Sequence, residues 1–176
     1  MVREEIRPGR NWPKETFVRC MFFVFGRALQ SLSRTDPILK RELSRWPDGF
    51  LILYKVLPDG PRLVLLRDRK GCLEYRGTRV REEEAGLVLT IKNVESAFLV
   101  MSLQLSTTQA YAEHRVGVKG SVPVAMSLIK CLSVLIAYLA PGKAAARVVR
   151  RLPGIPLRRK ICNRFRILFL GIPFGV

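Results

Sequence analysis

The chain has 176 residues, of which 48% are hydrophobic, and it carries a formal net charge of +17. This length fits one domain with extensions, and this apolar content excludes a disordered chain, because disordered chains lack the apolar surface that forms a core. The charge is uneven: residues 114–176 contain twelve Lys or Arg and no Asp or Glu, whereas residues 1–113 contain nineteen bases and fourteen acids. A basic, apolar half joined to a nearly balanced half indicates a docking surface for membrane lipid or nucleic acid.

The first predicted element is a helix that begins at Trp12, after a polar arm formed by residues 1–11. Apolar residues recur along it at helical spacing, namely Phe17, Met21, Val24, Phe25 and Leu29, and this stripe is widened by Phe22 and Phe23. The apolar surface is too wide for one packing face, so the helix either packs against a sheet or turns part of its aromatic face to lipid. A short second helix is expected next, with Asp36 as N-cap and Pro37 where its missing N–H loses nothing.

Five strands are predicted between residues 50 and 119. Phe50 to Leu57 is almost continuously apolar, and Pro58-Asp59-Gly60 turns the chain into a second strand over residues 62–67, so these two strands form a hairpin. Further strands are expected at residues 72–75, 87–91 and 115–119. The charged segment 81–84 is interpreted as a solvated loop rather than a metal site. Strands with helices before, within and after them predict an α+β fold, in which helices cover one face of a single sheet.

The apolar period changes from two residues to about 3.6 at Asn93, whose side-chain oxygen can cap the helix that follows. Ser106 offers a second N-cap before a short helix. Residues 122–140 then form a long and almost wholly apolar helix. Its length approaches that of a membrane span, but a central charge at Lys130 costs about 3 kcal/mol in a bilayer. A membrane span is therefore disfavoured, which leaves a core helix or a helix with one side on the sheet and the other lining a cavity.

Two segments of this region resemble the sterol carrier protein type-2 family, which consists of small lipid-binding domains. They read AGLVLTIKNVESAFLVM and STTQAYAEHRVGVKGSVPVAMSL, and they join a strand, a helix and a Val-x-Val-Lys-Gly strand end in a fixed order. The sequence departs from the family at Ser121, where members often carry an acidic residue. It departs again at His114, where members often carry glycine. Neither change alters the apolar periodicity, so the fold expectation stands.

The resemblance implies a cavity between sheet and helices that holds a hydrophobic lipid, whether acyl, sterol-like or isoprenoid, without altering it. On this interpretation the protein is not an enzyme and uses no cofactor or metal. Some bacterial members of the family look like accessory factors for isoprenoid quinone synthesis, which is an alternative role for the same cavity. The expected wall residues of the cavity are Phe98, Met101, Leu105, Tyr111, Val118, Met126, Ile129 and Leu132.

The chain ends in a basic extension, with nine bases and no acids between residues 143 and 176. Two helices are predicted there, over residues 143–151 and 157–170. The second mixes basic with apolar residues, as interfacial helices do. We expect this extension to dock on an anionic membrane, where the protein can meet lipid-synthesis enzymes. The expected docking residues are Arg147, Arg150, Arg151, Arg158, Arg159, Lys160, Arg164, Phe165, Arg166 and Phe169.

The predicted organisation is a helical segment over 1–46 that packs on the domain, a lipid-binding domain over 47–140 and the extension over 141–176.

Catalysis is not expected. His114 is the one residue suited to proton transfer near neutral pH, and no nucleophile elbow, His-Glu-x-x-His motif or glycine-rich phosphate loop accompanies it. The four cysteines are far apart, with no Cys-x-x-Cys pair, which predicts no zinc site. Without a secretory signal before them, they indicate a reducing compartment, so we expect a cytoplasmic protein that is peripherally associated with membrane.

Nucleic-acid binding is the alternative of another class, because a pI near 10.7 with clustered arginine is typical of such proteins. No helix-turn-helix, zinc finger or aromatic strand motif accompanies the charge, however. The bases of the extension lie beside Phe, Leu and Ile, and this mixture fits anionic headgroups over acyl chains better than it fits phosphates alone.

Overall fold

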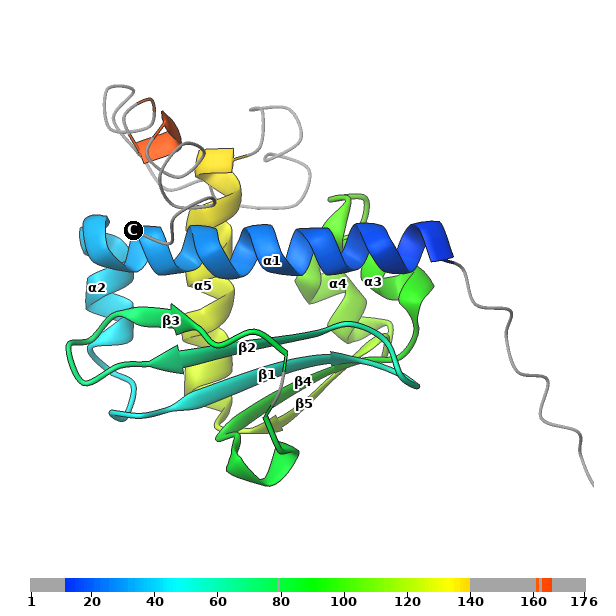
Figure 1. Cartoon of the computed structure of the whole chain (residues 1–176), viewed down its shortest axis with the longest axis horizontal. Helices are drawn as coiled ribbons and strands as arrows, with labels where there is room; N and C mark the ends of the chain where they lie inside the picture. Colours follow the sequence, from blue (N-terminus) through cyan, green and yellow to red (C-terminus); the bar gives the residue numbers. More distant parts are fainter. Residues whose placement is uncertain (1–11, 79, 140–160, 162, 166–176) are drawn as a thin grey trace, which may run out of the picture.

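Helix α1 (Trp12–Thr35) runs along the whole length of a sheet, and the other α-helices pack with it on the same face (Figure 1). A computed structural model of the chain describes residues 12–78, 80–139, 161 and 163–165. Within these residues the other helices are α2 (Pro37–Leu43), α3 (Val94–Met101), α4 (Thr107–Ala112), α5 (Val122–Leu139) and the short 3₁₀ helix η1 (Glu82–Glu84).

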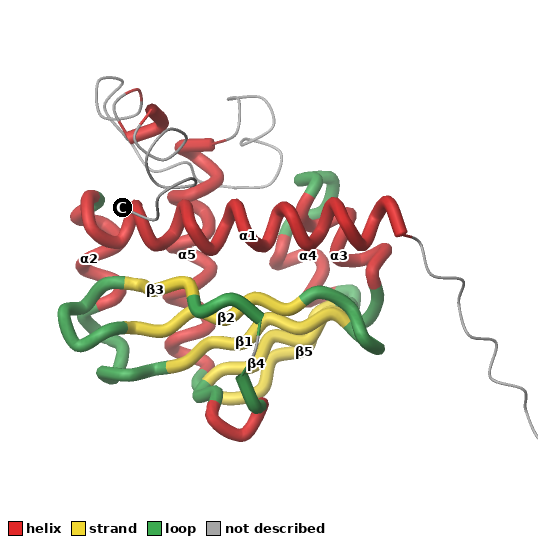
Figure 2. Tube along the Cα trace, viewed as in Figure 1, coloured by secondary structure: helices red, strands yellow, loops and turns green. Residues whose placement is uncertain are grey.

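The sheet is five-stranded and mixed (Figure 2). Its strands are β1 (Leu51–Val56), β2 (Arg62–Arg67), β3 (Leu73–Tyr75), β4 (Leu87–Ile91) and β5 (Val116–Gly120), in the order β3-β2-β1-β4-β5. Strands β1 and β4 pair in parallel, with Tyr54 opposite Leu89, and the other neighbours pair antiparallel. The predicted α+β fold with five strands is confirmed.

Three helices begin at the N-caps that the sequence predicts. The carboxylate of Asp36 accepts from the backbone N–H of Ile38 at 2.7 Å, which begins α2. Asn93 accepts from the N–H of Ser96 at 2.8 Å to begin α3, and the Ser106 hydroxyl accepts from that of Gln109 at 3.1 Å to begin α4. Each cap satisfies a backbone donor that has no partner within its own helix.

The buried face of α1 differs from the predicted stripe by a small rotation. The buried apolar residues of the helix are Val18, Phe22, Phe25, Ala28, Leu29 and Leu32. Met21 and Val24 are only partly buried, and Phe23 is 40% exposed. Because the helix carries apolar residues on more than half of its circumference, spacing alone does not show which of them meets the sheet. The sheet itself selects the face that contains Phe22 and Phe25.

Polar residues of α1 close one edge of the sheet. The Ser33 hydroxyl accepts from the backbone N–H of Leu73 at 3.0 Å, and the Gln30 side-chain oxygen accepts from that of Tyr75 at 3.1 Å. Both N–H groups belong to the edge strand β3 and point away from β2. The helix thus supplies the acceptors that a sixth strand would otherwise provide, which protects an exposed edge from pairing with another chain.

The opposite face of the sheet is covered by the chain segment between β3 and β4. Leu53, Val64 and Val88 are almost fully buried there, and Val80 and Ala85 of that segment pack against them. Lys55 and Glu82 form an ion pair of 2.5 Å over the same face. The acidic segment 81–84 is exposed, which agrees with the predicted solvated segment.

Helix α5 is the one helix in the described part of the chain that is long and apolar enough to cross a membrane, with a mean hydropathy of 2.0. A buried core helix meets the same criterion, and 56% of α5 is buried within this fold. Lys130 at its middle pairs with Glu42 of α2 at 3.4 Å, and the neighbouring Ser127 hydroxyl bonds the same carboxylate at 2.9 Å. These contacts fix α5 against α2.

The predicted helix over residues 143–151 lies outside the described residues. Of the second predicted helix, over residues 157–170, only Ile161 and residues 163–165 are described.

Candidate functional site

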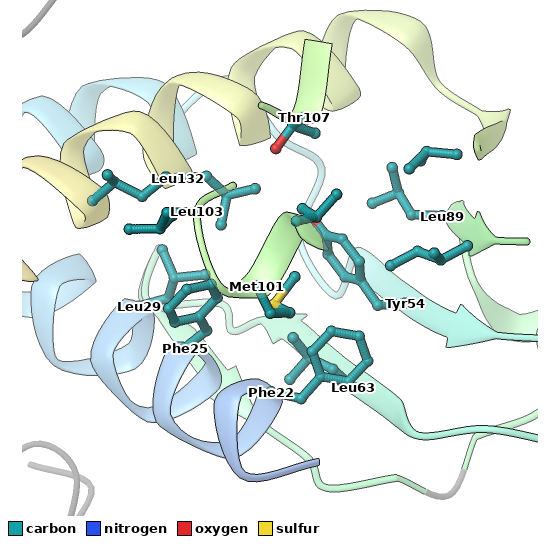
Figure 3. A pocket seen from close by; sticks show the side chains of 14 residues that line it. Phe22, Phe25, Leu29, Tyr54, Leu63, Leu89, Met101, Leu103, Thr107 and Leu132 are labelled. Carbon is teal, nitrogen blue, oxygen red and sulfur yellow. The ribbon is translucent and has the colours of Figure 1, made fainter. Parts of the chain in front are cut away.

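A pocket lies between α1, α5 and the inner face of the sheet (Figure 3). Fourteen residues line it: Phe22, Phe25, Leu29, Tyr54, Leu63, Leu89, Ile91, Val100, Met101, Leu103, Thr107, Val116, Leu132 and Ile136. Twelve of these side chains are wholly apolar, and the remaining two, Tyr54 and Thr107, carry a hydroxyl group. The site therefore offers a ligand a hydrophobic surface with two hydrogen-bonding groups.

Residues from α1, from the strands and from α5 meet in this pocket. Phe22, Phe25 and Leu29 project from one side of α1 because positions three and seven residues apart share a helical face. The strands contribute inward-facing residues, such as Tyr54 of β1 and Leu63 of β2, because side chains alternate between the faces of a sheet. Helix α5 adds its own residues from the far side. The pocket is thus a gap between layers rather than a product of any one element.

The turn between α3 and α4 forms one wall. Leu103 has φ +61°, a left-handed conformation that is uncommon for a residue with a branched side chain. Its N–H donates to the carbonyl of Val100 at 3.2 Å, which tightens the turn after α3. This turn places Leu103 beside Leu132 of α5 (Figure 3).

The partly exposed lining residues show where the pocket opens to solvent. Leu103, Thr107 and Leu132 are partly exposed, whereas the other eleven lining residues are buried. These three residues come from the α3–α4 turn, the first residue of α4 and the middle of α5. The pocket therefore opens between α5 and the α3–α4 region.

The pocket is narrow. Its cavity volume is about 40 Å³. Ligand pockets usually measure about 300 to 1,000 Å³. The cavity is therefore much smaller than a typical ligand pocket, because opposing side chains stand close together. A long ligand would fit only with flexible side chains such as Met101 turned aside.

Tyr54 is the polar residue deepest in this site. Its side chain is 7% exposed, and its ring lies 6.1 Å from that of Phe22, centroid to centroid. Its hydroxyl makes no hydrogen bond to any residue that the structure describes. Burial raises the pKa of the phenol well above its ordinary value, and the nearby Cys131 thiol acts in the same direction. Tyr54 is therefore a neutral hydrogen-bonding group at physiological pH.

Two of the eight predicted wall residues, Met101 and Leu132, line the pocket. Phe98 instead packs on Phe17 of α1, with ring centroids 5.1 Å apart. Three further residues are partly buried without lining the pocket, namely Leu105, Val118 and Ile129.

Tyr111 and Met126, which are also predicted wall residues, do not line this pocket. Tyr111 is 58% exposed on α4, and Met126 is 57% exposed on α5. Helix α5 is apolar on all sides, so its sequence does not show which side faces the sheet. Met126 lies on the same side as Val122, one turn earlier, which is also exposed.

Sequence reasoning missed the contributions of α1 and of the strands. A signal for them was present: the aromatic stripe of α1 is wider than one packing face needs, and Phe22 and Phe25 are part of it. Tyr54 stood out less, because a single tyrosine in a continuously apolar strand reads as an ordinary core residue.

Of the predicted docking residues, only Arg164 and Phe165 belong to the described residues. Both are exposed, Phe165 by 60%. The remaining eight, which are Arg147, Arg150, Arg151, Arg158, Arg159, Lys160, Arg166 and Phe169, lie outside the described residues.

Neither the histidine nor the cysteines form a reactive cluster within the described residues. His114 is exposed at the C-terminal end of α4. No group of three or more His, Cys, Asp or Glu side chains there is arranged to hold a metal ion. Cys131 is buried, and burial raises the pKa of its thiol to about 12. A thiol in this state is a poor nucleophile near neutral pH.

No protein-family model matches the chain. No curated protein matches its sequence either. Among solved structures, it is similar to a protein described as the UbiJ-SCP2 ubiquinone synthesis protein, with 15% sequence identity, a TM-score of 0.49 and coverage of 68% of this chain and 98% of that one. It is also similar to sterol carrier protein domain 2 of Helicoverpa armigera, with 18% identity, a TM-score of 0.43 and coverage of 77% and 93%. Sterol carrier protein 2 of Yarrowia lipolytica gives 15% identity, a TM-score of 0.42 and coverage of 62% and 85%.

All three are sterol carrier protein 2 or SCP2-like proteins. They belong to the family that the two motifs at residues 85–101 and 106–128 resemble in sequence. The mixed five-stranded sheet with helices on one face agrees with that resemblance.

Proposed function

We propose that this protein binds a hydrophobic lipid in the pocket between α1, α5 and the sheet, and holds it without altering it. The observation that carries this proposal is the lining itself, in which twelve of fourteen side chains are wholly apolar. A pocket of this composition takes apolar chains because burial removes their surface from water. The described residues of the pocket offer no nucleophile with an adjacent base, which supports a binding role over a catalytic one.

Burial supplies enough free energy for such a role. Removing about 400 Å² of apolar ligand surface from water at about 25 cal/mol/Å² contributes roughly 10 kcal/mol. Ordering of the ligand and of the side chains that turn aside reduces this value by several kcal/mol. The net affinity is then in the range that permits a lipid to be both captured and released.

The test uses two tryptophan variants on the same helix. Leu132→Trp enlarges a side chain at the entrance, and Met126→Trp enlarges one on the exposed side of α5. We expect wild type and Met126→Trp to bind a neutral fluorescent lipid saturably, and Leu132→Trp to bind it at least tenfold more weakly. Circular dichroism of each variant checks folding. Equal binding by all three proteins, or no saturable binding by folded wild type, contradicts the proposed function.

We further propose that the basic extension holds the loaded protein at an anionic membrane on the cytoplasmic side, where lipid is exchanged or presented to lipid-synthesis enzymes. The nine bases between residues 143 and 176, with no acids among them, support this part of the proposal. An accessory role in isoprenoid quinone synthesis is the narrower version. Mass spectrometry of lipid that co-purifies with the native protein distinguishes the two, because only the narrower version requires a prenylated aromatic ligand.

A further inference from the structure

None of the described residues that line the pocket is charged. None of its fourteen side chains belongs to Asp, Glu, Lys, Arg or His, and Tyr54 is the only titratable residue among them. A carboxylate or phosphate placed inside would lose its hydration and gain no cation in exchange, which is strongly unfavourable. The charge of the protein as a whole, +17, does not change this for the described lining, to which no lysine or arginine belongs.

The Tyr54 hydroxyl is a hydrogen-bonding group without a partner among the described residues, on a side chain that is 93% buried, since 7% of it is exposed. This hydroxyl is not among the described side-chain atoms that are both fully buried and unpaired, so it reaches the open space of the pocket that Tyr54 lines. This hydroxyl is held in place, because Tyr54 belongs to the central strand β1, with β2 on one side and β4 on the other. Its ring lies among the lining side chains (Figure 3).

We propose that the pocket selects neutral lipids that carry a single hydroxyl or carbonyl oxygen, and that the Tyr54 hydroxyl hydrogen-bonds to that oxygen. The inference rests on the proposed function, since it names the class of lipid that the same pocket takes. The apolar chain of the ligand occupies the surface formed by α1, α5 and the inner strands. The Tyr54 hydroxyl can donate to either kind of oxygen, and it can also accept from a hydroxyl group.

Thr107 provides an internal comparison. It carries the only other hydroxyl among the described lining residues, but it is partly exposed at the entrance, where solvent can reach it. Loss of a water-accessible hydroxyl costs a ligand little, whereas loss of a buried one removes a hydrogen bond that water does not replace. The two hydroxyls are therefore expected to differ in their effect on lipid affinity.

The experiment measures displacement of a neutral fluorescent lipid by four competitors of equal chain length: a hydrocarbon, a primary alcohol, a methyl ketone and a fatty acid. Wild type is compared with Tyr54→Phe, which keeps the ring and removes only the hydroxyl, and with Thr107→Val. We expect wild type to prefer the alcohol or the ketone over the hydrocarbon. Tyr54→Phe should bind the preferred compound about five- to tenfold more weakly, as loss of one hydrogen bond requires. It should bind the hydrocarbon as before, and Thr107→Val should match wild type within about twofold.

The fatty acid tests the exclusion of charge. We expect it to bind wild type only in its neutral form, so that its affinity falls by up to about tenfold for each pH unit above the pKa of its carboxyl group. The affinity of the alcohol should not change over the same pH range.

The outcomes separate this inference from the proposed function. If folded wild type binds none of the four compounds, the proposed function itself fails. If it binds the hydrocarbon as tightly as the alcohol and the ketone, or if Tyr54→Phe loses no preference, the lipid-binding role stands and the assignment to Tyr54 is wrong. Binding of the fatty acid that is tight and independent of pH overturns the neutral-ligand inference. Phenylalanine has nearly the same shape as tyrosine, so Tyr54→Phe is expected to keep the fold. Thermal unfolding of this variant checks this directly.

Discussion

His114 shows how one residue can occupy a position made for another. It has φ +54° and follows α4. Its N–H donates to the carbonyl of Tyr111 at 3.0 Å, and the N–H of Arg115 donates to that of Ala110 at 2.9 Å. These two bonds form a Schellman motif, in which the residue with positive φ is usually glycine. The resembled family often has glycine here, and the structure supplies the physical reason.

We therefore expect His114→Gly to stabilise the protein by roughly 0.5 to 1 kcal/mol, because a residue with a Cβ pays about 1 to 2 kcal/mol in the left-handed region, less the extra entropy of glycine in the unfolded chain. Chemical denaturation measures the change. His114→Ala is the control, since alanine keeps the Cβ and should give no gain. If His114→Gly and His114→Ala are equally stable, the positive φ of residue 114 does not lower the stability of the wild-type protein.

Cys131 makes the stability of the folded protein depend on pH in the alkaline range. Burial, helped by the carboxylates of Glu42 and Asp36, raises the pKa of its thiol from 9.0 to about 12. Above pH 9 the unfolded chain loses this proton while the folded protein keeps it, so stability is present below pH 9 and falls as the pH rises toward 12.

We predict that wild type loses about 1 kcal/mol more stability than Cys131→Ala between pH 9 and pH 10. Urea unfolding at several pH values measures this, and the difference in slope matters rather than the absolute stability, which the truncated side chain also lowers. Parallel pH profiles of the two proteins would show that the thiol titrates alike in both states.

At the scale of elements, the contact of α1 with the edge strand β3 depends on a polar side chain in the middle of an apolar helix face. Ser33 is buried, accepts from the N–H of Leu73 and donates to the carbonyl of Gln30 at 2.7 Å. Ser31 lies two residues earlier in the same helix and is also buried, but its hydroxyl has no partner among the described residues. The two serines form a natural matched pair.

We expect Ser33→Ala to destabilise the protein by about 1 to 3 kcal/mol, because the Leu73 N–H is left buried and unpaired. Ser31→Ala should be neutral or slightly stabilising, since it removes a hydroxyl that is unsatisfied already. Thermal and chemical unfolding of both variants check the prediction. Equal losses from the two substitutions would mean that α1 is held by apolar packing alone.

For the molecule as a whole, the question is where its positive charge acts. If four to six bases of the extension contact an anionic surface, they contribute about 4 to 6 kcal/mol to binding. Salt weakens this attraction for a membrane and for nucleic acid alike, so salt dependence does not separate the two partners. The apolar residues of the extension do separate them.

We predict that full-length protein binds anionic liposomes, and that Phe165→Ser with Phe169→Ser weakens this binding more than it weakens binding to DNA or RNA. Phe23→Ser in α1 is the control, because Phe23 is 40% exposed on the other candidate surface for lipid. Liposome co-sedimentation and nucleic-acid titration provide the two measurements. Full liposome affinity in the double variant refutes docking through the extension, and loss in Phe23→Ser alone assigns the contact to α1.

The sequence by itself determined the elements and their order. The N-caps at Asp36, Asn93 and Ser106, the hairpin turn at Pro58-Asp59-Gly60 and the position of strand β4 agree with the prediction, because each depends on residues a few positions apart. Such local signals are strong wherever polar and apolar residues alternate with a clear period. They also suffice for the fold class, since the order of helices and strands restricts the layers that can form.

Only the tertiary structure decided which residues form the pocket. Met126 and Leu132 are both apolar and both belong to α5, yet one is exposed and the other lines the entrance. A helix that is apolar on all sides has no stripe to show its orientation, and α1 has the same property in weaker form. The orientation of each is set by packing against strands that are distant in sequence. The pocket, with Tyr54 inside it, exists only where those layers meet.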